Sequence, residues 1–144
     1  MLDSNEYKIS DRYVKNSGSV FLTGVQALAR LPIQQLRADK QRGLNTAAFL
    51  AGYPGSPLAG LNFEIDKAKS LVTDLPIIHR PVLNEEHAAT AVMGSQLAAE
   101  QPDCNYDGIF GLWYGKAPGL DRDGDALRHA VFTATSSNCG AVAH

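Results

Sequence analysis

The chain has 144 residues, of which 44% are hydrophobic and 19% are charged, and its formal net charge is -2. A chain of this size and composition buries a real core and is typical of one globular unit. The near-neutral charge argues against nucleic acid as a main partner, because phosphate binding needs a basic face. No stretch approaches the length of a membrane span, so no membrane association is expected.

The cysteines and the N-terminal residues indicate the cellular compartment in which the chain is expected. The chain holds two cysteines, Cys104 and Cys139, which form no CxxC pair and no Cys/His metal spacing. The sequence therefore predicts neither a zinc site nor an iron–sulfur cluster within this chain, and no metal ligand is expected. The stretch from Met1 to Lys8 is polar and carries acids, unlike a secretory signal. A reduced, cytoplasmic setting is the expectation.

Apolar periodicity predicts the elements in chain order. Residues 1–22 alternate around a Gly-containing turn, which indicates a small N-terminal hairpin or arm. Helices are expected over residues 23–42 with a kink near Pro32, 61–72, 85–101 and 125–136, and strands over 46–50, 77–83, 108–114 and 140–143. The alternation predicts a three-layer α/β domain over 23–144, a parallel sheet with helices on both faces. We expect that sheet to be incomplete at its carboxyl end.

Three candidate sites follow strands, where parallel sheets bind ligands. The most informative is the junction at Asn84 and Glu85, where an apolar run meets a helix-capping Asn and then a carboxylate. A carboxylate on the first turn of a helix in an apolar setting is a candidate reagent. Glu86 points elsewhere on the helix. The alternative is that both acids merely favour the positive helix start.

The other two candidates are a turn and a loop. Gly55 and Ser56 lie in a strand-to-helix turn, where Ser56 offers a hydroxyl and an N–H to an anion; the alternative is a tight turn with a Ser cap. The loop that follows residue 114 carries Lys116 and Arg122, either of which suits an acidic substrate or phosphate. The alternatives are a solvated loop and, less favoured, a calcium loop, whose distal Glu is missing.

Three motifs at these places resemble one family. They are GYPGSP at residues 52–57, LNEEHAATAVMGSQ at 83–96 and GLWYGKAPGLDRDGDALRHA at 111–130. In this order and at this spacing they are similar to the start of the bacterial indolepyruvate ferredoxin oxidoreductase family, which consists of thiamine-diphosphate-dependent 2-oxoacid:ferredoxin oxidoreductases. The resemblance runs from about Tyr13 to His144.

The resemblance implies a fold and a set of site residues. It implies the thiamine-diphosphate-binding fold, with this chain as a fragment that holds the pyrimidine-binding domain. Glu85 matches the family's catalytic Glu, which contacts the aminopyrimidine of the cofactor and shares a proton with its ring N1', and Gly55 belongs to the same cofactor site. Ser56 matches a hydroxyl position that faces the substrate carboxylate, although the family turn is of the YPxTP type. Lys116 and Arg122 would lie near the entrance and bind substrate.

The resemblance also implies an activity and partners. The complete enzyme would oxidatively decarboxylate a 2-oxo acid such as indolepyruvate to an acyl-CoA, with electrons passed to ferredoxin. Coenzyme A, ferredoxin and the remaining domains or subunits would be partners, in a homo-oligomer. Thiamine diphosphate also needs Mg²⁺ and a diphosphate-binding half, whose GDG motif this sequence lacks, as it lacks cluster-binding cysteines.

Two alternatives to that enzyme remain open. The chain alone is expected to be inactive, because the sequence lacks the diphosphate half and the clusters. One alternative is a non-catalytic remnant or assembly module of the same fold. An unrelated Rossmann-like nucleotide binder is disfavoured, because the sequence has no GxGxxG.

Overall fold

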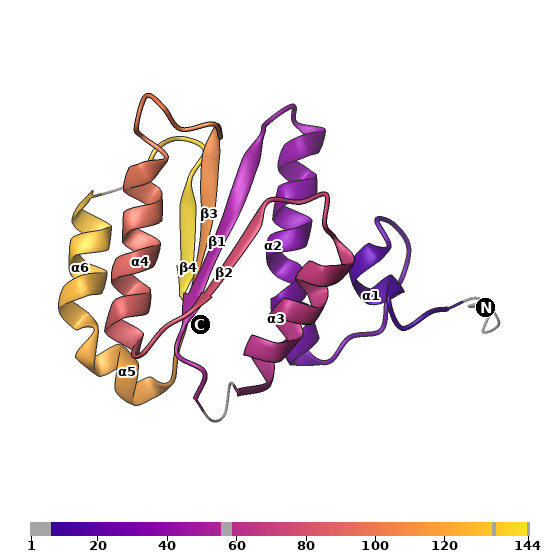
Figure 1. Cartoon of the computed structure of the whole chain (residues 1–144), viewed down its shortest axis with the longest axis horizontal. Helices are drawn as coiled ribbons and strands as arrows, with labels where there is room; N and C mark the ends of the chain where they lie inside the picture. The colour runs from indigo at the N-terminus through magenta and orange to yellow at the C-terminus, as the bar shows by residue number, and fades with distance from the viewer. Residues whose placement is uncertain (1–6, 56–58, 134, 144) are drawn as a thin grey trace.

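The sheet confirms the predicted α/β class. The computed structural model describes residues 7–55, 59–133 and 135–143. Within them, four parallel strands form one sheet in the order β2-β1-β3-β4 (Figure 1). Their bounds are β1 Thr46–Gly52, β2 Ile77–Pro81, β3 Gly108–Tyr114 and β4 Gly140–Ala143. Each strand lies close to where the apolar runs predicted it, although β1 is longer and β2 shorter than expected.

Helices cover both faces of the sheet. Figure 1 shows α2 and α3 on one face and α4 and α6 on the other, and each pair packs together. The bounds are α1 Asp11–Val14, α2 Gly24–Gln41, α3 Ala59–Leu71, α4 Glu85–Ala98, α5 Ala117–Arg122 and α6 Gly124–Thr133. Thr23 opens α2 with a reciprocal capping box to Gln26, and α2 continues unbroken through Pro32.

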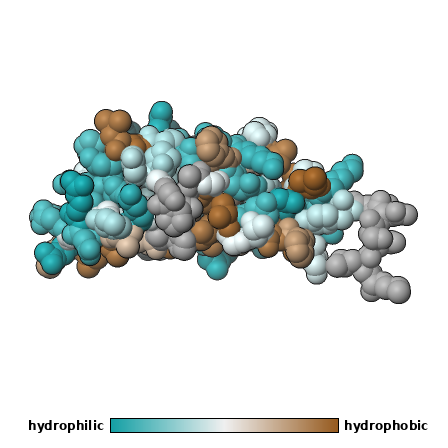
Figure 2. Space-filling model, turned by 90° about the horizontal axis from the view of Figure 1, so that it is seen from below, coloured by the Kyte–Doolittle hydropathy of each residue, from teal (hydrophilic) through white to brown (hydrophobic). Residues whose placement is uncertain are grey.

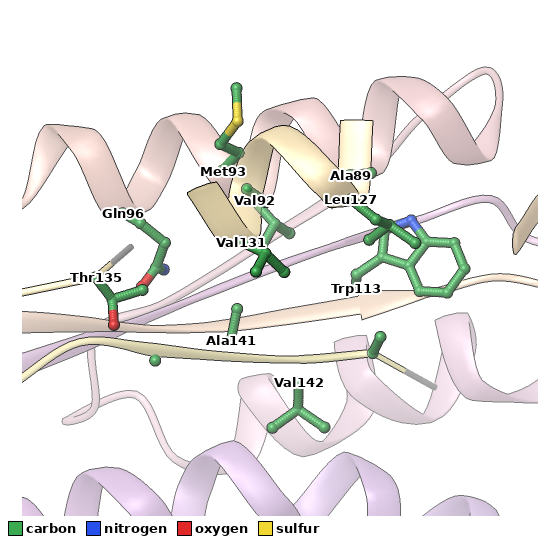
Figure 3. A pocket seen from close by; sticks show the side chains of 13 residues that line it. Ala89, Val92, Met93, Gln96, Trp113, Leu127, Val131, Thr135, Ala141 and Val142 are labelled. Atoms are coloured by element: carbon green, nitrogen blue, oxygen red, sulfur yellow. The ribbon is translucent and has the colours of Figure 1, made fainter. Parts of the chain in front are cut away.

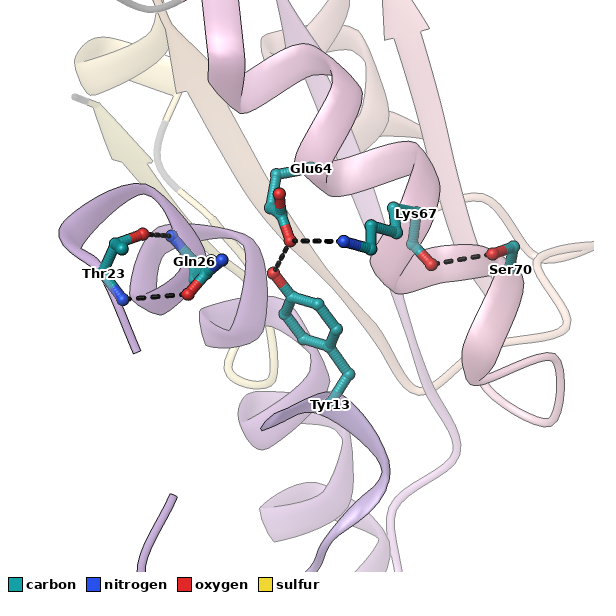
Figure 4. A network of polar contacts seen from close by, with 6 residues as sticks. All are labelled: Tyr13, Thr23, Gln26, Glu64, Lys67 and Ser70. Carbon is teal, nitrogen blue, oxygen red and sulfur yellow. Dashed lines mark hydrogen bonds and ion pairs between the residues drawn. The ribbon is translucent and has the colours of Figure 1, made fainter. Parts of the chain in front are cut away.

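The N-terminal arm differs from the hairpin that the alternation predicts. No strand forms within residues 7–22, and the short helix α1 occupies part of this segment. The side chain of Tyr13 is fully buried, and its hydroxyl donates to Glu64 Oε1 of α3 at 2.6 Å (Figure 4). Arg30 of α2 donates to the carbonyl oxygens of Arg12 and Lys15. The arm is therefore anchored to α3 by the Tyr13 side chain and to α2 by hydrogen bonds from the Arg30 side chain to backbone carbonyls of the arm.

The core has two parts, one on each face of the sheet. Leu50, Leu112 and Tyr114 face α2 and α3, whereas Ala51 and Trp113 face α4. This alternation follows the period of two in each strand. β1 is buried along nearly its whole length, as expected for a central parallel strand covered on both faces.

The chain order creates a topological switch point between β1 and β3, at the end of the sheet formed by the carboxyl ends of the strands. This end is called the carboxyl edge below. After β1 the chain enters α3 on one face, and after β3 it enters α5 and α6 toward the opposite face (Figure 1). Adjacent parallel strands whose connections leave in opposite directions open a crevice beyond their carboxyl ends. That edge also carries the first turn of α4. Among the described residues, no helix is both long and apolar enough to cross a membrane.

Candidate functional site

Glu85 is the central residue of the carboxyl edge. Asn84 adopts an extended backbone and its Oδ1 accepts from the N–H of His87 at 2.8 Å, so the predicted N-cap is present. Glu85 is therefore the first residue of α4, and it is 9% exposed, whereas Glu86 is exposed. The indole Nε1 of Trp113 donates to the carbonyl oxygen of Glu85 at 3.0 Å. The two adjacent acids thus occupy different environments, as the helical geometry predicts.

Two glycines make room for the Glu85 side chain. A Cβ built on Gly119 would lie 2.3 Å from Cγ of Glu85, and one on Gly115 would lie 2.9 Å from the same atom. Gly115 lies two residues before α5, and Gly119 lies within α5. The expected long loop after β3 is therefore partly helical, and α5 lies directly over the first turn of α4. Glu85 can be buried here because glycine at these two positions has no side chain.

The structure brings one predicted substrate residue to the turn after β1. A Cβ on Gly55 would lie 3.9 Å from Cδ of Lys116, so the exposed Lys116 side chain crosses the gap between the ends of β1 and β3. Arg122 is exposed in the last turn of α5 and makes no hydrogen bond or ion pair with any described residue. Ser56 lies outside the described residues. Figure 2 looks onto this edge, where hydrophilic residues predominate and apolar ones form small separate groups.

Asp123 is a site residue that the sequence alone does not single out. The described residues contain no group of three or more acidic, His or Cys side chains that would hold a metal ion. Asp123 is instead 1% exposed, and neither carboxyl oxygen has a hydrogen-bond partner among the described residues. Burial raises the pKa of its carboxyl, and the charges of Glu85 and Glu86 raise it further, against a lowering by Arg122.

This raised pKa predicts how stability depends on pH. The folded state binds the Asp123 proton more tightly than the unfolded state, so its stabilising contribution is full at acidic pH and is lost as the pH rises through the folded pKa. Asp123→Asn keeps a neutral side chain of the same shape. We therefore expect this variant to gain stability over the wild type as the pH rises from about 4. Urea unfolding across pH measures this, with the exposed Asp121→Asn as control. Parallel pH curves for wild type and Asp123→Asn would contradict it.

A second polar cluster lies on the α3 side of the same edge. Both ring nitrogens of His79 are hydrogen-bonded: Nδ1 lies 2.7 Å from Asp66 Oδ1, and Nε2 lies 2.8 Å from the Tyr114 hydroxyl. The Tyr114 hydroxyl in turn donates to Asn62 Oδ1 at 3.1 Å. Burial, together with the charge of Asp66, raises the pKa of Tyr114 to about 12, so its hydroxyl stays protonated. The sequence alone does not single out His79. The glycine at position 52 is the one trace of this cluster in the sequence, because the Tyr114 ring leaves no room for a side chain there. A Cβ on Gly52 would lie 2.3 Å from the ring.

An apolar cavity of about 610 Å³ adjoins the site between α4, α6, β3 and β4. Figure 3 shows the Trp113 ring at one end of it and Gln96 and Thr135 at the other. Val131 and Val142 also line this cavity and are exposed. Trp113 therefore contacts the cavity with its ring and Glu85 with its Nε1.

Comparisons of this chain with protein-family models, curated proteins and solved structures find no match.

Proposed function

We propose that this chain forms the aminopyrimidine-contacting wall of a thiamine-diphosphate-dependent 2-oxoacid:ferredoxin oxidoreductase of the indolepyruvate type. The observation that carries the proposal is the place of Glu85. It is a buried carboxyl on the first turn of α4, beyond the carboxyl ends of the parallel strands and beneath two glycines. A carboxyl in such a place suits proton exchange with a nitrogen of a bound ring.

The residues at this edge fit one half of the cofactor. Glu85 would hold the proton shared with the aminopyrimidine, and the turn at Gly55 would lie beside the ring. When bound, thiamine diphosphate supplies the carbanion chemistry at the 2-oxo carbon. The protein's contribution is to orient Glu85 through the Asn84 cap and the Trp113 hydrogen bond, and to exclude water from its side chain with α5.

Substrate recognition is assigned to the cationic side of the same edge. Lys116 crosses from β3 toward the turn after β1, where its ammonium group suits the carboxylate of a 2-oxo acid. Arg122 and Ser56 complete the proposed substrate set. Sites for Mg²⁺, the iron–sulfur clusters, coenzyme A and ferredoxin are assigned to other parts of a cytoplasmic, homo-oligomeric enzyme.

The test of this function is turnover by the complete protein. With thiamine diphosphate, Mg²⁺ and coenzyme A present, we expect indolepyruvate or another 2-oxo acid to reduce a viologen dye. Omission of coenzyme A or of the cofactor should abolish the reduction. A folded complete protein that reduces no dye with any aryl or aliphatic 2-oxo acid would contradict the proposal and favour the non-catalytic module.

We further expect the 144-residue chain alone to bind thiamine diphosphate weakly or not at all. It offers a wall for the pyrimidine and no GDG motif for the diphosphate and Mg²⁺. Calorimetric titration of the cofactor with Mg²⁺ present measures this, and the complete protein is the positive control. Sub-micromolar binding by the monomeric chain would show the expectation to be wrong.

A further inference from the structure

The apolar cavity between α4, α6, β3 and β4 owes its space to small side chains. Ala89 of α4, Ala130 of α6 and Ala141 of β4 line it, so each wall of the cavity carries a residue with no more than a methyl group. Its volume of about 610 Å³ lies within the range of sites that bind small organic molecules. The cavity is therefore large enough for such a ligand.

A buried polar side chain reaches this cavity. Gln96 of α4 is 5% exposed, and Figure 3 shows it extending from the helix toward the strands. Its Nε2 donates to Ser95 Oγ at 3.2 Å, and a Cβ on Gly111 would lie 3.0 Å from that nitrogen, so the glycine leaves room for the amide. The Ser95 hydroxyl donates its proton to the Val92 carbonyl oxygen at 2.7 Å, so it can only accept from Gln96. The amide nitrogen is thereby fixed toward Ser95, and Oε1 is turned away from it.

Oε1 of Gln96 is a hydrogen-bond acceptor without a donor. It is buried, and no described residue donates to it. Buried side-chain oxygens nearly always have a partner, because an unsatisfied oxygen loses its bonds to water without replacement. Because Gln96 lines the cavity, a molecule bound there is placed to supply the missing donor.

The remaining lining indicates the chemistry of such a molecule. No charged side chain lines the described part of the cavity, so an ionised ligand would lose its hydration without gaining an ion pair. The Trp113 ring lies at the end opposite Gln96 and offers an aromatic surface (Figure 3). These properties do not suit thiamine diphosphate or a 2-oxo acid, which are charged. The cavity is therefore a separate site from the one proposed at the carboxyl edge.

We propose that this cavity binds a neutral aromatic molecule with one N–H or O–H donor, its rings among the alanine and valine side chains and its donor on Oε1 of Gln96. Burial of the rings supplies the affinity, and the single acceptor selects molecules that carry a donor. Val131 and Val142 are exposed residues of the lining, so a bound molecule covers apolar surface that the chain leaves in contact with solvent. The proposal does not depend on the activity proposed for Glu85.

The experiment titrates the 144-residue chain with two probes of closely similar shape, 2-naphthol and naphthalene, and follows the side-chain methyl groups by NMR. We expect shifts and intermolecular nuclear Overhauser contacts at the methyl groups of Val92, Met93 and Leu127, which line the cavity. 2-Naphthol should bind about tenfold more tightly than naphthalene, the value of one hydrogen bond to an acceptor that is otherwise unsatisfied.

Three variants test the part played by Gln96. Gln96→Leu removes the acceptor, so the two probes should bind this variant with equal affinity. Gln41→Leu makes the same replacement at an exposed position of α2, on the other face of the sheet, and should leave the preference for 2-naphthol in place. Ala141→Leu should fill the cavity and abolish the binding of both probes.

Amide spectra establish that each variant is folded, and the wild-type titration decides the proposal even where a variant does not fold. Equal affinities of the two probes for the wild type, or contacts confined to residues outside the cavity, would overturn it. Methyl shifts at Val92, Met93 and Leu127 that change with protein concentration in the ligand-free chain would overturn it too, because a second copy would then occupy the cavity. Selective binding of 2-naphthol by a complete protein that turns over no 2-oxo acid would support this site and count against the proposed function alone.

Discussion

Under the proposed function, Glu85→Gln in the complete protein is expected to slow exchange of the C2 proton of thiamine diphosphate by about 10²–10⁴-fold, the usual value of one acid–base partner. The amide has the shape of the carboxyl and can fill the space beneath Gly115 and Gly119. It cannot exchange a proton with the cofactor nitrogen. The fold should therefore persist while deprotonation slows. Hydrogen–deuterium exchange at C2, followed by NMR after acid quench, measures the rate.

Glu86→Gln is the matched control for this experiment. Glu86 carries the same carboxyl one residue later, about 100° around the helix, and is exposed. Its substitution should change the exchange rate far less than that of Glu85. If Glu86→Gln abolished exchange and Glu85→Gln left it intact, the assignment of the reactive carboxyl would be wrong.

Gly52→Ala is expected to destabilise the fold by about 3 kcal/mol, at the upper end for overpacking a buried site. The new Cβ would lie 2.3 Å from the Tyr114 ring and 2.4 Å from the Tyr114 carbonyl oxygen. The ring is held by His79 and Asn62, and the carbonyl belongs to the sheet backbone, so neither can withdraw freely. Urea unfolding monitored by circular dichroism measures the loss.

The control for this prediction has the opposite expected sign. Gly94 lies exposed within α4, and a Cβ there meets nothing within 4 Å. Gly94→Ala should therefore stabilise the fold by roughly 0.5–1 kcal/mol, because alanine restricts the unfolded chain and favours helix. Equal effects of the two substitutions would mean that the contact with Tyr114 is not the reason why position 52 requires glycine.

The elements that the sequence predicted well are those with local signals. Asn84 is the predicted capping residue of α4, and in the structure its side chain accepts the hydrogen bond that its type predicts. β3 occupies the predicted bounds, because its apolar run is continuous and bounded by polar residues. Of the predicted hairpin or arm, the hairpin does not form within residues 7–22, because the apolar spacing around Tyr13 fits alternation as well as it fits one turn of helix.

The parts of the site that the sequence did not reveal depend on contacts between distant residues. α5 is a short helix that contains Gly119, which disfavours helix locally, and it packs over Glu85 through this glycine. The contact of His79 with Tyr114 requires β2 and β3 to flank β1 in one particular register. Asp123 was one acid of three in a polar stretch, and only the packing of α5 on α4 distinguishes it from Asp121.

The hydrogen bond from Trp113 to the Glu85 carbonyl has a spectroscopic consequence. The chain contains a single tryptophan, so its fluorescence arises from one indole whose Nε1 is bonded at the first turn of α4. Indole emission shifts when this N–H loses its acceptor or when water reaches the ring. Unlabelled protein therefore carries an optical reporter at the position where Glu85 is held. Stopped-flow emission can follow movement of that turn in real time, separately from any catalytic assay.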